Sequence, residues 1–116
     1  RRDLQNDMKK QGRPWCIGKG FDHSAPIGPI TPAAQAGDVG RAAIWLQVNG
    51  ADRQRSTVAQ LIWNIAETIE HLSAAWELAP GDLIYTGTPE GVGAVVRGDT
   101  LEGGVDGLTP LRLSVV

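Results

Sequence analysis

The strongest hydrophobic pattern in the chain predicts one amphipathic helix from about residue 58 to residue 76. Apolar side chains recur there three, four and seven residues apart, which puts them on one stripe of a helix. Thr57 and Gln60 have the spacing of a capping box, so we expect the helix to begin there. The stripe consists of Val58, Leu61, Ile62, Ile65, Ile69, Leu72 and Trp76.

A β-hairpin is predicted just before this helix. Residues 42–48 form a mostly apolar run, and residues 51–55 form the short returning strand. Asn49-Gly50 lies between them, and this dipeptide suits a type I′ turn because both positions need a positive φ angle. The sequence therefore predicts two antiparallel strands joined by a tight turn.

Three further strands are predicted after the helix. Residues 83–86 read as a short buried strand that ends in a glycine-rich segment. Residues 100–105 and 111–116 flank Asp106-Gly107, which favours a second turn. Before the hairpin, residues 1–13 are polar and predict either a short helix or a solvated lead-in. An irregular stretch follows from Pro14 to Pro32, and loops of that length are uncommon unless they have a function.

Composition favours a loop-rich, mainly β architecture of the α+β class. The 116 residues include 15 glycines and seven prolines, while 41% are hydrophobic and 21% are charged. The net charge of −2 provides no basic field for phosphate backbones, so no nucleic-acid partner is expected. No apolar run reaches the length of a membrane span, so no membrane partner is expected either. The single cysteine, Cys16, suits a reducing, cytoplasmic setting.

The first residues indicate that the chain is part of a longer polypeptide. It begins Arg1-Arg2-Asp3-Leu4-Gln5, without an initiator methionine or the pattern of a signal peptide. We therefore expect residues 1–116 to be a fragment of a longer protein.

The segment after residues 83–86 is a candidate anion site. Gly87, Gly91 and Gly93 allow the backbone to approach a ligand closely, and Thr88 adds a hydroxyl group. Such a turn suits a carboxylate or an oxyanion. It is not a P-loop, since no Lys-Ser or Lys-Thr follows the last glycine. The alternative is a tight structural loop after a core strand.

Lys19 is the candidate catalytic side chain. It lies between Gly18 and Gly20, which leave its ammonium group few steric neighbours. A lysine in this setting can pair with a carboxylate or stabilise an enolate. Asp22 either orients Lys19 or caps the turn, and the alternative for Lys19 is an ordinary solvent-exposed loop lysine.

The remaining titratable side chains favour structural interpretations. Glu67 and His71 are four residues apart and would share one helical face, a spacing that two metal ligands can use. That face is opposite the apolar stripe, so a solvated polar face is the favoured interpretation. His23 is interpreted as structural or exposed, and Cys16 as an inert small side chain.

Three segments follow one another along the whole chain, namely Arg1 to Gln5, Gly18 to Pro29 and Thr86 to Gly93. In their order and spacing they resemble the fumarylacetoacetate hydrolase family. A further likeness is the hairpin Val48-Asn49-Gly50 with Arg53-Gln54 after it. The branch that looks most similar is that of the fumarylpyruvate and acylpyruvate hydrolases, on the basis of residues 1–5, Gly-Arg-Pro-Trp at 12–15 and Lys-Gly-Phe-Asp at 19–22.

This resemblance implies a mixed β-roll with Mg²⁺ or Mn²⁺ at its mouth, and a homodimer. In the family two glutamates and an aspartate bind the metal, and a lid histidine and glutamate activate water. The positions of these five residues precede the segment that matches Arg1, so the resemblance assigns no metal ligand to this chain. It implies that residues 1–116 are the C-terminal part of the family's catalytic domain. The resemblance also implicates any exposed tryptophan in the dimer interface.

The residues that carry over from the family lie on the substrate side. Arg2 and Gln5 match polar residues of the site, and Lys19 matches the active-site lysine. Thr88 matches the threonine that meets the substrate carboxylate, with the backbone from Gly87 onward beside it. Arg55-Ser56 departs from a glycine common in relatives, and we expect this to alter a loop only.

The resemblance implies metal-dependent hydrolysis of a C–C bond in a short acylpyruvate, a small 2-oxo acid such as fumarylpyruvate. In this hypothesis the metal chelates the 2-oxo acid, a lid base activates water, and Lys19 neutralises the developing carbanion. An oxaloacetate decarboxylase, or a diketo-acid isomerase or hydratase, is the alternative within the fold. A non-catalytic β-module for assembly or ligand binding is the alternative from another class.

Overall fold

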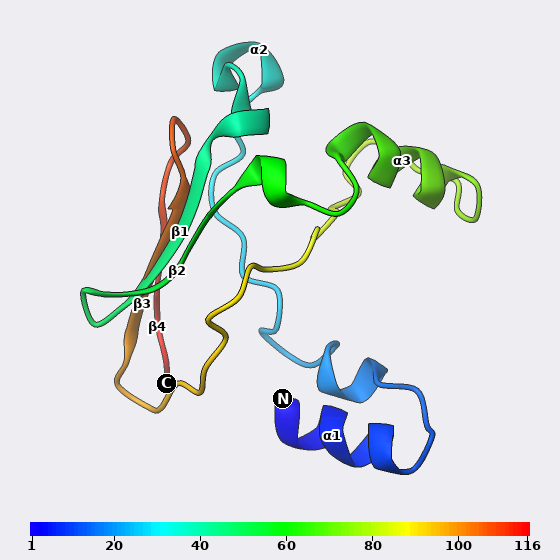
Figure 1. Cartoon of the computed structure of the whole chain (residues 1–116), viewed down its shortest axis with the longest axis vertical. Helices are drawn as coiled ribbons and strands as arrows, with labels where there is room; N and C mark the ends of the chain where they lie inside the picture. Colours follow the sequence, from blue (N-terminus) through cyan, green and yellow to red (C-terminus); the bar gives the residue numbers. More distant parts are fainter.

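A four-stranded antiparallel sheet forms the body of the protein in the computed structural model, which describes residues 1–116 (Figure 1). The spatial order of the strands is β2-β1-β3-β4. This confirms the mainly β, α+β fold class and the strands predicted around both turns. Arg55 and Ser56 lie inside β2, so the expectation that they alter only a loop is wrong. The strands are β1 Ala43–Val48, β2 Ala51–Thr57, β3 Thr100–Val105 and β4 Leu111–Ser114.

The hairpin between β1 and β2 forms as its turn residues predict. Asn49 and Gly50 both have positive φ angles, 53° and 80°. The Asn49 side chain also joins the hairpin to the start of β3, because Nδ2 donates to Asp99 at 2.8 Å and Oδ1 accepts from the Thr100 N–H at 2.9 Å. Hydrogen bonds from the Val96 N–H and from Asn49 lower the pKa of Asp99 below its ordinary value. The turn is thereby fixed from two sides.

A β-bulge interrupts the β1–β2 ladder. Leu46 pairs with Gln54 and Gln47 pairs with Asp52, so Arg53 is one extra residue on β2 with no partner on β1. Bulges re-aim the side chains and carbonyl groups next to them. Here Gln54 is buried while Arg53 stays exposed.

Helical segments surround the sheet without covering it. In Figure 1 the unit of α1 and η1 and the helix α3 project from the same side of the sheet as separate arms. The short helix over the polar lead-in confirms one of the two structures predicted for residues 1–13. The helices are α1 Arg2–Lys10, η1 Cys16–Gly18, α2 Ala33–Ala36, η2 Val39–Arg41, η3 Val58–Gln60 and α3 Ile65–Ser73.

The helix predicted from residue 58 to residue 76 is shorter than its apolar pattern suggests. After η3 the chain turns extended at Leu61, with ψ at 136°, and α3 begins only after Asn64. The capping box uses Asn64 and Glu67 instead of Thr57 and Gln60: the Asn64 side chain accepts from the Glu67 N–H, and the Glu67 carboxylate accepts from the Asn64 N–H. A reciprocal cap satisfies two free N–H groups at once and thereby sets the start of the helix.

Replacing Asn64 with alanine is expected to lower the free energy of unfolding by about 1 kcal/mol, because the substitution removes the cap of α3. Chemical denaturation of the full-length protein measures this loss. Asn6→Ala is the matched control, since Asn6 is exposed on α1 and its side chain makes no hydrogen bond. Equal losses in the two variants would contradict the assigned cap.

No strand forms over residues 83–86, so this prediction is wrong. The segment is exposed and runs without a neighbouring strand from the end of α3 toward β2. A strand requires a hydrogen-bonding partner, and an apolar run alone does not supply one. The Tyr85 hydroxyl instead donates to the carbonyl of Ala25 at 3.0 Å.

The chain encloses almost no core. Only three of 116 residues are buried, namely Gly18, Val48 and Gln54. The radius of gyration is 15.7 Å, whereas a compact domain of this length has about 13 Å. Many large apolar side chains are therefore exposed, among them Ile62 at 97%.

No helix in the structure combines the length and the apolar character required to cross a lipid bilayer.

Candidate functional site

The first wall of the candidate site is the contact between η1 and α1. Gly18 is buried against the first turn of α1, where an added Cβ would lie 2.9 Å from the Gln5 nitrogen and 3.1 Å from the Arg1 carbonyl oxygen. These distances leave room only for glycine. The next residue, Lys19, ends η1 with its N–H bonded to the Cys16 carbonyl at 2.9 Å. The predicted site segments Arg2–Gln5 and Lys19 therefore lie side by side.

Two of the cations on this wall are unpaired. The Arg1 guanidinium binds Asp3 at 2.6 Å, and hydrogen bonding from Arg1 lowers the pKa of Asp3 below its ordinary value. Arg2 and Lys19 are exposed, and neither side chain forms an ion pair or a hydrogen bond with another residue. Both charges are therefore available to attract a small anion.

The second wall is the turn that follows Thr86. Gly87 and Gly91 have φ angles of 100° and 93°, as expected for glycines that bend the backbone. The buried Gln54 side chain on β2 holds this turn. Its Nε2 lies 2.9 Å from Thr88 Oγ1, 2.7 Å from the Pro89 carbonyl oxygen and 3.1 Å from the Glu90 carbonyl oxygen.

Gly91 gives the turn a second point of attachment on β2. A Cβ added there would overlap the carbonyl oxygen of Arg53 and would lie 3.3 Å from the Gln54 side chain. Arg53 is the extra residue of the bulge, so the irregularity in β2 lies directly beneath this glycine. The turn and the bulge fit together as one local structure.

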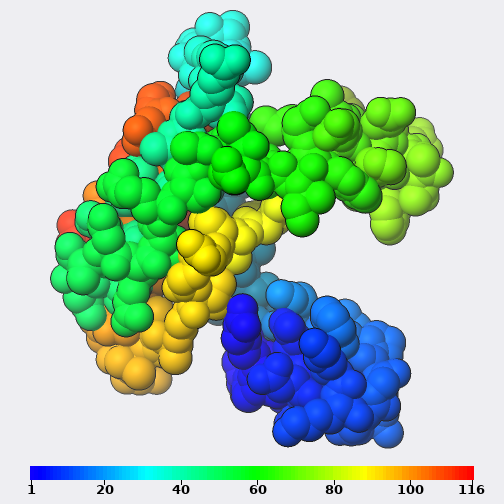
Figure 2. All heavy atoms as spheres, in the orientation of Figure 1, coloured from blue at the N-terminus to red at the C-terminus, as the bar shows by residue number.

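The two walls are connected but do not touch through their site residues. The hydrogen bond from Tyr85 to Ala25 links the segment before Thr88 to the loop after Lys19. No hydrogen bond or ion pair joins Lys19 to Thr88. In Figure 2 the blue N-terminal unit and the yellow segment near residue 85 border an open hollow, with green α3 on its far side.

A groove of about 1490 Å³ lies on the second-wall side. It is lined by the sheet, η3, α3 and residues 82–90, and it includes Thr88. Lys19, Arg2 and Gln5 are not part of its lining, which is mostly apolar. The groove thus runs along one exposed face of the sheet, and the polar side chains of the first wall lie outside it.

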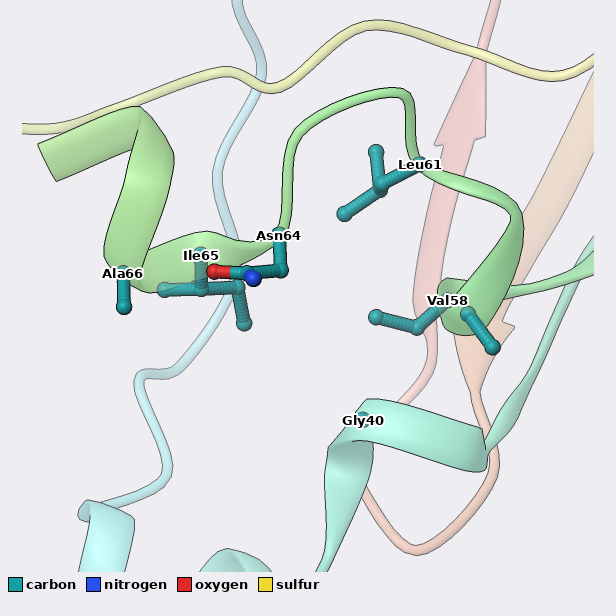
Figure 3. A pocket seen from close by; sticks show the side chains of 7 residues that line it. Gly40, Val58, Leu61, Asn64, Ile65 and Ala66 are labelled. Atoms are coloured by element: carbon teal, nitrogen blue, oxygen red, sulfur yellow. The ribbon is translucent and has the colours of Figure 1, made fainter. Parts of the chain in front are cut away.

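A smaller cavity of about 270 Å³ lies between η2 and the start of α3 (Figure 3). Asn64 provides its only polar side chain, and the Asn64 oxygen is already bonded to the Glu67 N–H. The side chains of Val58, Leu61 and Ile65 surround the rest. The lining contains no titratable or nucleophilic side chain, so this cavity is not a reaction site.

The other candidate side chains do not form a site. Glu67 caps α3, and His71 stacks on Trp63 with ring centroids 4.0 Å apart. His23 is exposed with a φ angle of 61°, and Cys16 is an exposed free thiol. No three His, Cys, Asp or Glu side chains of this chain gather where they could hold a metal ion. The residues present therefore do not fit a metal centre by themselves.

Reasoning from the sequence missed Gln54, the side chain that holds the second wall. One signal for it existed, because Gln54 stands between Arg53 and Arg55 and an uncharged residue between two charges on a strand points inward. Tyr85 was assigned to a strand, so its bond to Ala25 was not foreseen. The bulge that places Gln54 has no marker in the sequence.

The sequence matches the family described as "Fumarylacetoacetate (FAA) hydrolase C-terminal" over residues 1–116. Among curated proteins, the fumarylpyruvate hydrolase of Ralstonia sp. is 50% identical over 115 residues, which cover 99% of this chain and 59% of that protein. The mitochondrial oxaloacetate tautomerase of Rattus norvegicus is 40% identical over 114 residues, covering 98% of this chain and 52% of the relative. This chain spans about half the length of the curated relatives it matches.

A solved structure has the same arrangement. The fumarylpyruvate hydrolase of Pseudomonas aeruginosa, determined in complex with Mn²⁺ and pyruvate, superposes with a TM-score of 0.94 at 61% sequence identity. The match covers 99% of this chain and 49% of that one.

Proposed function

Because this chain belongs to the fumarylacetoacetate hydrolase family, we propose that the protein containing it hydrolyses a C–C bond in a short acylpyruvate such as fumarylpyruvate. The observation that carries the proposal is that two exposed, unpaired cations, Arg2 and Lys19, lie on α1 and at the end of η1, the two segments that meet at the buried Gly18. A 2-oxo acid presents a carboxylate and a carbonyl oxygen, and both attract such cations. The similarity to the fumarylpyruvate hydrolases of Ralstonia and Pseudomonas supports this substrate class.

In the proposed reaction, water adds to the acyl carbonyl of the substrate and the bond between that carbon and carbon 3 of the pyruvate unit breaks. The electron pair of this bond passes to the pyruvate unit as an enolate, which then takes a proton. The products are a carboxylic acid and pyruvate. Lys19 neutralises the charge that grows on the enolate, and Thr88 with the backbone near Gly87 holds the substrate carboxylate.

The full-length protein would add what residues 1–116 do not supply. The Pseudomonas relative contains Mn²⁺ with pyruvate, and this supports a divalent metal, Mg²⁺ or Mn²⁺, in the complete site. Since the donor set of this chain does not fit a metal, we propose that the ligands and the base that activates water come from residues preceding Arg1. Residues 1–116 would then be the C-terminal part of the catalytic domain.

The proposal also includes a homodimer in a cytoplasmic setting. Trp15, Trp63 and Trp76 are exposed, and exposed tryptophans are typical of interface residues. Trp45 is half-buried in β1 and is not a candidate for that surface.

Oxaloacetate tautomerisation is the second candidate function, favoured by the 40% identity to the mitochondrial tautomerase of the rat. It requires the same stabilisation of an enolate but no attack by water. Assays of the full-length protein with Mg²⁺ or Mn²⁺ separate the two reactions. We expect fumarylpyruvate to give equal amounts of fumarate and pyruvate, with oxaloacetate converted more slowly.

The products of these assays also identify a tautomerase, a decarboxylase or a non-catalytic module. Faster enolisation of oxaloacetate without cleavage of fumarylpyruvate would replace the hydrolase by the tautomerase, and release of CO₂ would indicate a decarboxylase. The absence of turnover with either substrate would favour a non-catalytic module.

A further inference from the structure

The buried amide of Gln54 is a polar group whose role the proposed reaction leaves open. Gln54 is only 8% exposed, the one polar side chain buried in the chain. Burying an amide without partners is unfavourable, so its bonding pattern carries information about what it holds. All of its partners lie in residues 88–90, more than 30 positions away in sequence.

The partners fix the orientation of this amide. Nε2 faces the carbonyl oxygens of Pro89 and Glu90, at 2.7 and 3.1 Å. In the reversed orientation the amide oxygen would face two carbonyl oxygens at these distances, and neither can donate a hydrogen bond. Nε2 therefore points into the turn, where it also reaches Thr88 Oγ1 at 2.9 Å.

This orientation determines what the Thr88 hydroxyl group can do. As the acceptor of the bond from Nε2, Thr88 Oγ1 keeps its own hydrogen for another partner. Within the chain that partner is Gln54 Oε1, at the longer distance of 3.2 Å. A substrate carboxylate is charged and is a stronger acceptor than an amide oxygen, so it can take over this hydrogen.

We propose that Gln54 is a positioning residue that holds the Thr88 turn on β2 and presents the Thr88 hydroxyl group as a donor to the substrate carboxylate. This inference rests on the proposed function, because it assumes that a carboxylate binds at Thr88. Gln54 itself does not touch the substrate. The bulge at Arg53 aids it by bringing the turn and β2 into contact at Gly91.

Pyruvate binding to the full-length protein tests this role, with Gln54→Met as the variant. Methionine matches the length of the side chain and removes its hydrogen bonds. We expect about 10- to 100-fold weaker binding, the range for losing a hydrogen bond to a charged group. Gln47→Met is the matched control on the same hairpin, where the amide bonds only to Asp52, and it should bind like the wild type.

A double-mutant cycle separates positioning from a general structural effect. If Gln54 acts through the Thr88 hydroxyl group, Gln54→Met weakens pyruvate binding in the wild type but not in a Thr88→Val background. An equal loss in both backgrounds, or unchanged binding in the single variant, overturns the inference. Should Gln54→Met fail to fold, Gln54→Glu carries the same test, since it keeps the volume and replaces the donor by an acceptor.

Failure of the proposed function gives a different result. A wild-type protein that binds pyruvate but cleaves no acylpyruvate refutes the proposed hydrolase activity. The double-mutant cycle on pyruvate binding then still tests the role of Gln54. A wild type that binds no pyruvate overturns both.

Discussion

Replacing Lys19 with alanine is expected to lower kcat/KM for fumarylpyruvate by about 10²- to 10³-fold in the full-length protein. Lys19 is exposed at the end of η1 and has no ion partner in the chain, so its charge is available to the substrate. The enolate places more negative charge within reach of the Lys19 ammonium group than the ground-state ketone does. The loss should therefore fall mainly on kcat, with a smaller rise in KM.

Steady-state kinetics of two further variants show whether the effect belongs to this position. Lys10→Ala removes an exposed lysine from the last turn of α1 and should leave kcat near the wild-type value. Lys19→Arg keeps the positive charge but carries it on a planar guanidinium group, so it should recover part of the activity. A Lys19→Ala enzyme as fast as the Lys10→Ala enzyme would remove Lys19 from the mechanism.

Replacing Gly91 with alanine is expected to release the Thr88 turn from β2. An added Cβ would overlap the Arg53 carbonyl oxygen, and the φ angle of 93° is unfavourable for any residue with a side chain. Left-handed strain costs about 1–2 kcal/mol, and overpacking typically costs about 1–3 kcal/mol. We therefore expect the free energy of unfolding to fall by about 3 kcal/mol, together with weaker pyruvate binding.

Gly98→Ala provides a closely matched control for the backbone strain. Gly98 has a φ angle of 94°, and nothing lies within 4 Å of the position of its Cβ. Its alanine variant should lose only the strain contribution of about 1–2 kcal/mol and should bind pyruvate normally. Denaturant unfolding and pyruvate titration of both variants measure the difference, and similar behaviour of the two would show that the contact with Arg53 is unimportant.

The parts of the fold that follow from the sequence are those fixed by neighbouring residues. Asn49-Gly50 specifies its hairpin because both residues tolerate a positive φ angle, and Asp106-Gly107 marks the turn between β3 and β4. Residues 58–76 were predicted as one helix because apolar spacing does not distinguish α3 from the turn before it. The capping box of Asn64 and Glu67, which replaces the one expected at Thr57 and Gln60, sets the start of α3.

Residues 83–86 show what cannot be predicted from neighbouring residues alone. Their apolar run suggested a strand, but a strand exists only where another strand pairs with it, and none does so here. The pattern of apolar residues likewise cannot predict that Lys19 lies near Gln5, because this depends on how closely Gly18 approaches α1. Family resemblance supplied Lys19 and Thr88 as site residues. Their roles stay predictions until the variants are measured.

The bulge at Arg53 also has a consequence for how this protein can change in length over evolution. Surface loops usually accept insertions and deletions without harm, but β2 contains an extra residue that the Thr88 turn uses. Removing that residue would give a more regular ladder and would displace the carbonyl group against which Gly91 fits. We expect length variation among homologous proteins to accumulate in the irregular stretch before β1 and to spare the segment between Asn49 and Thr57.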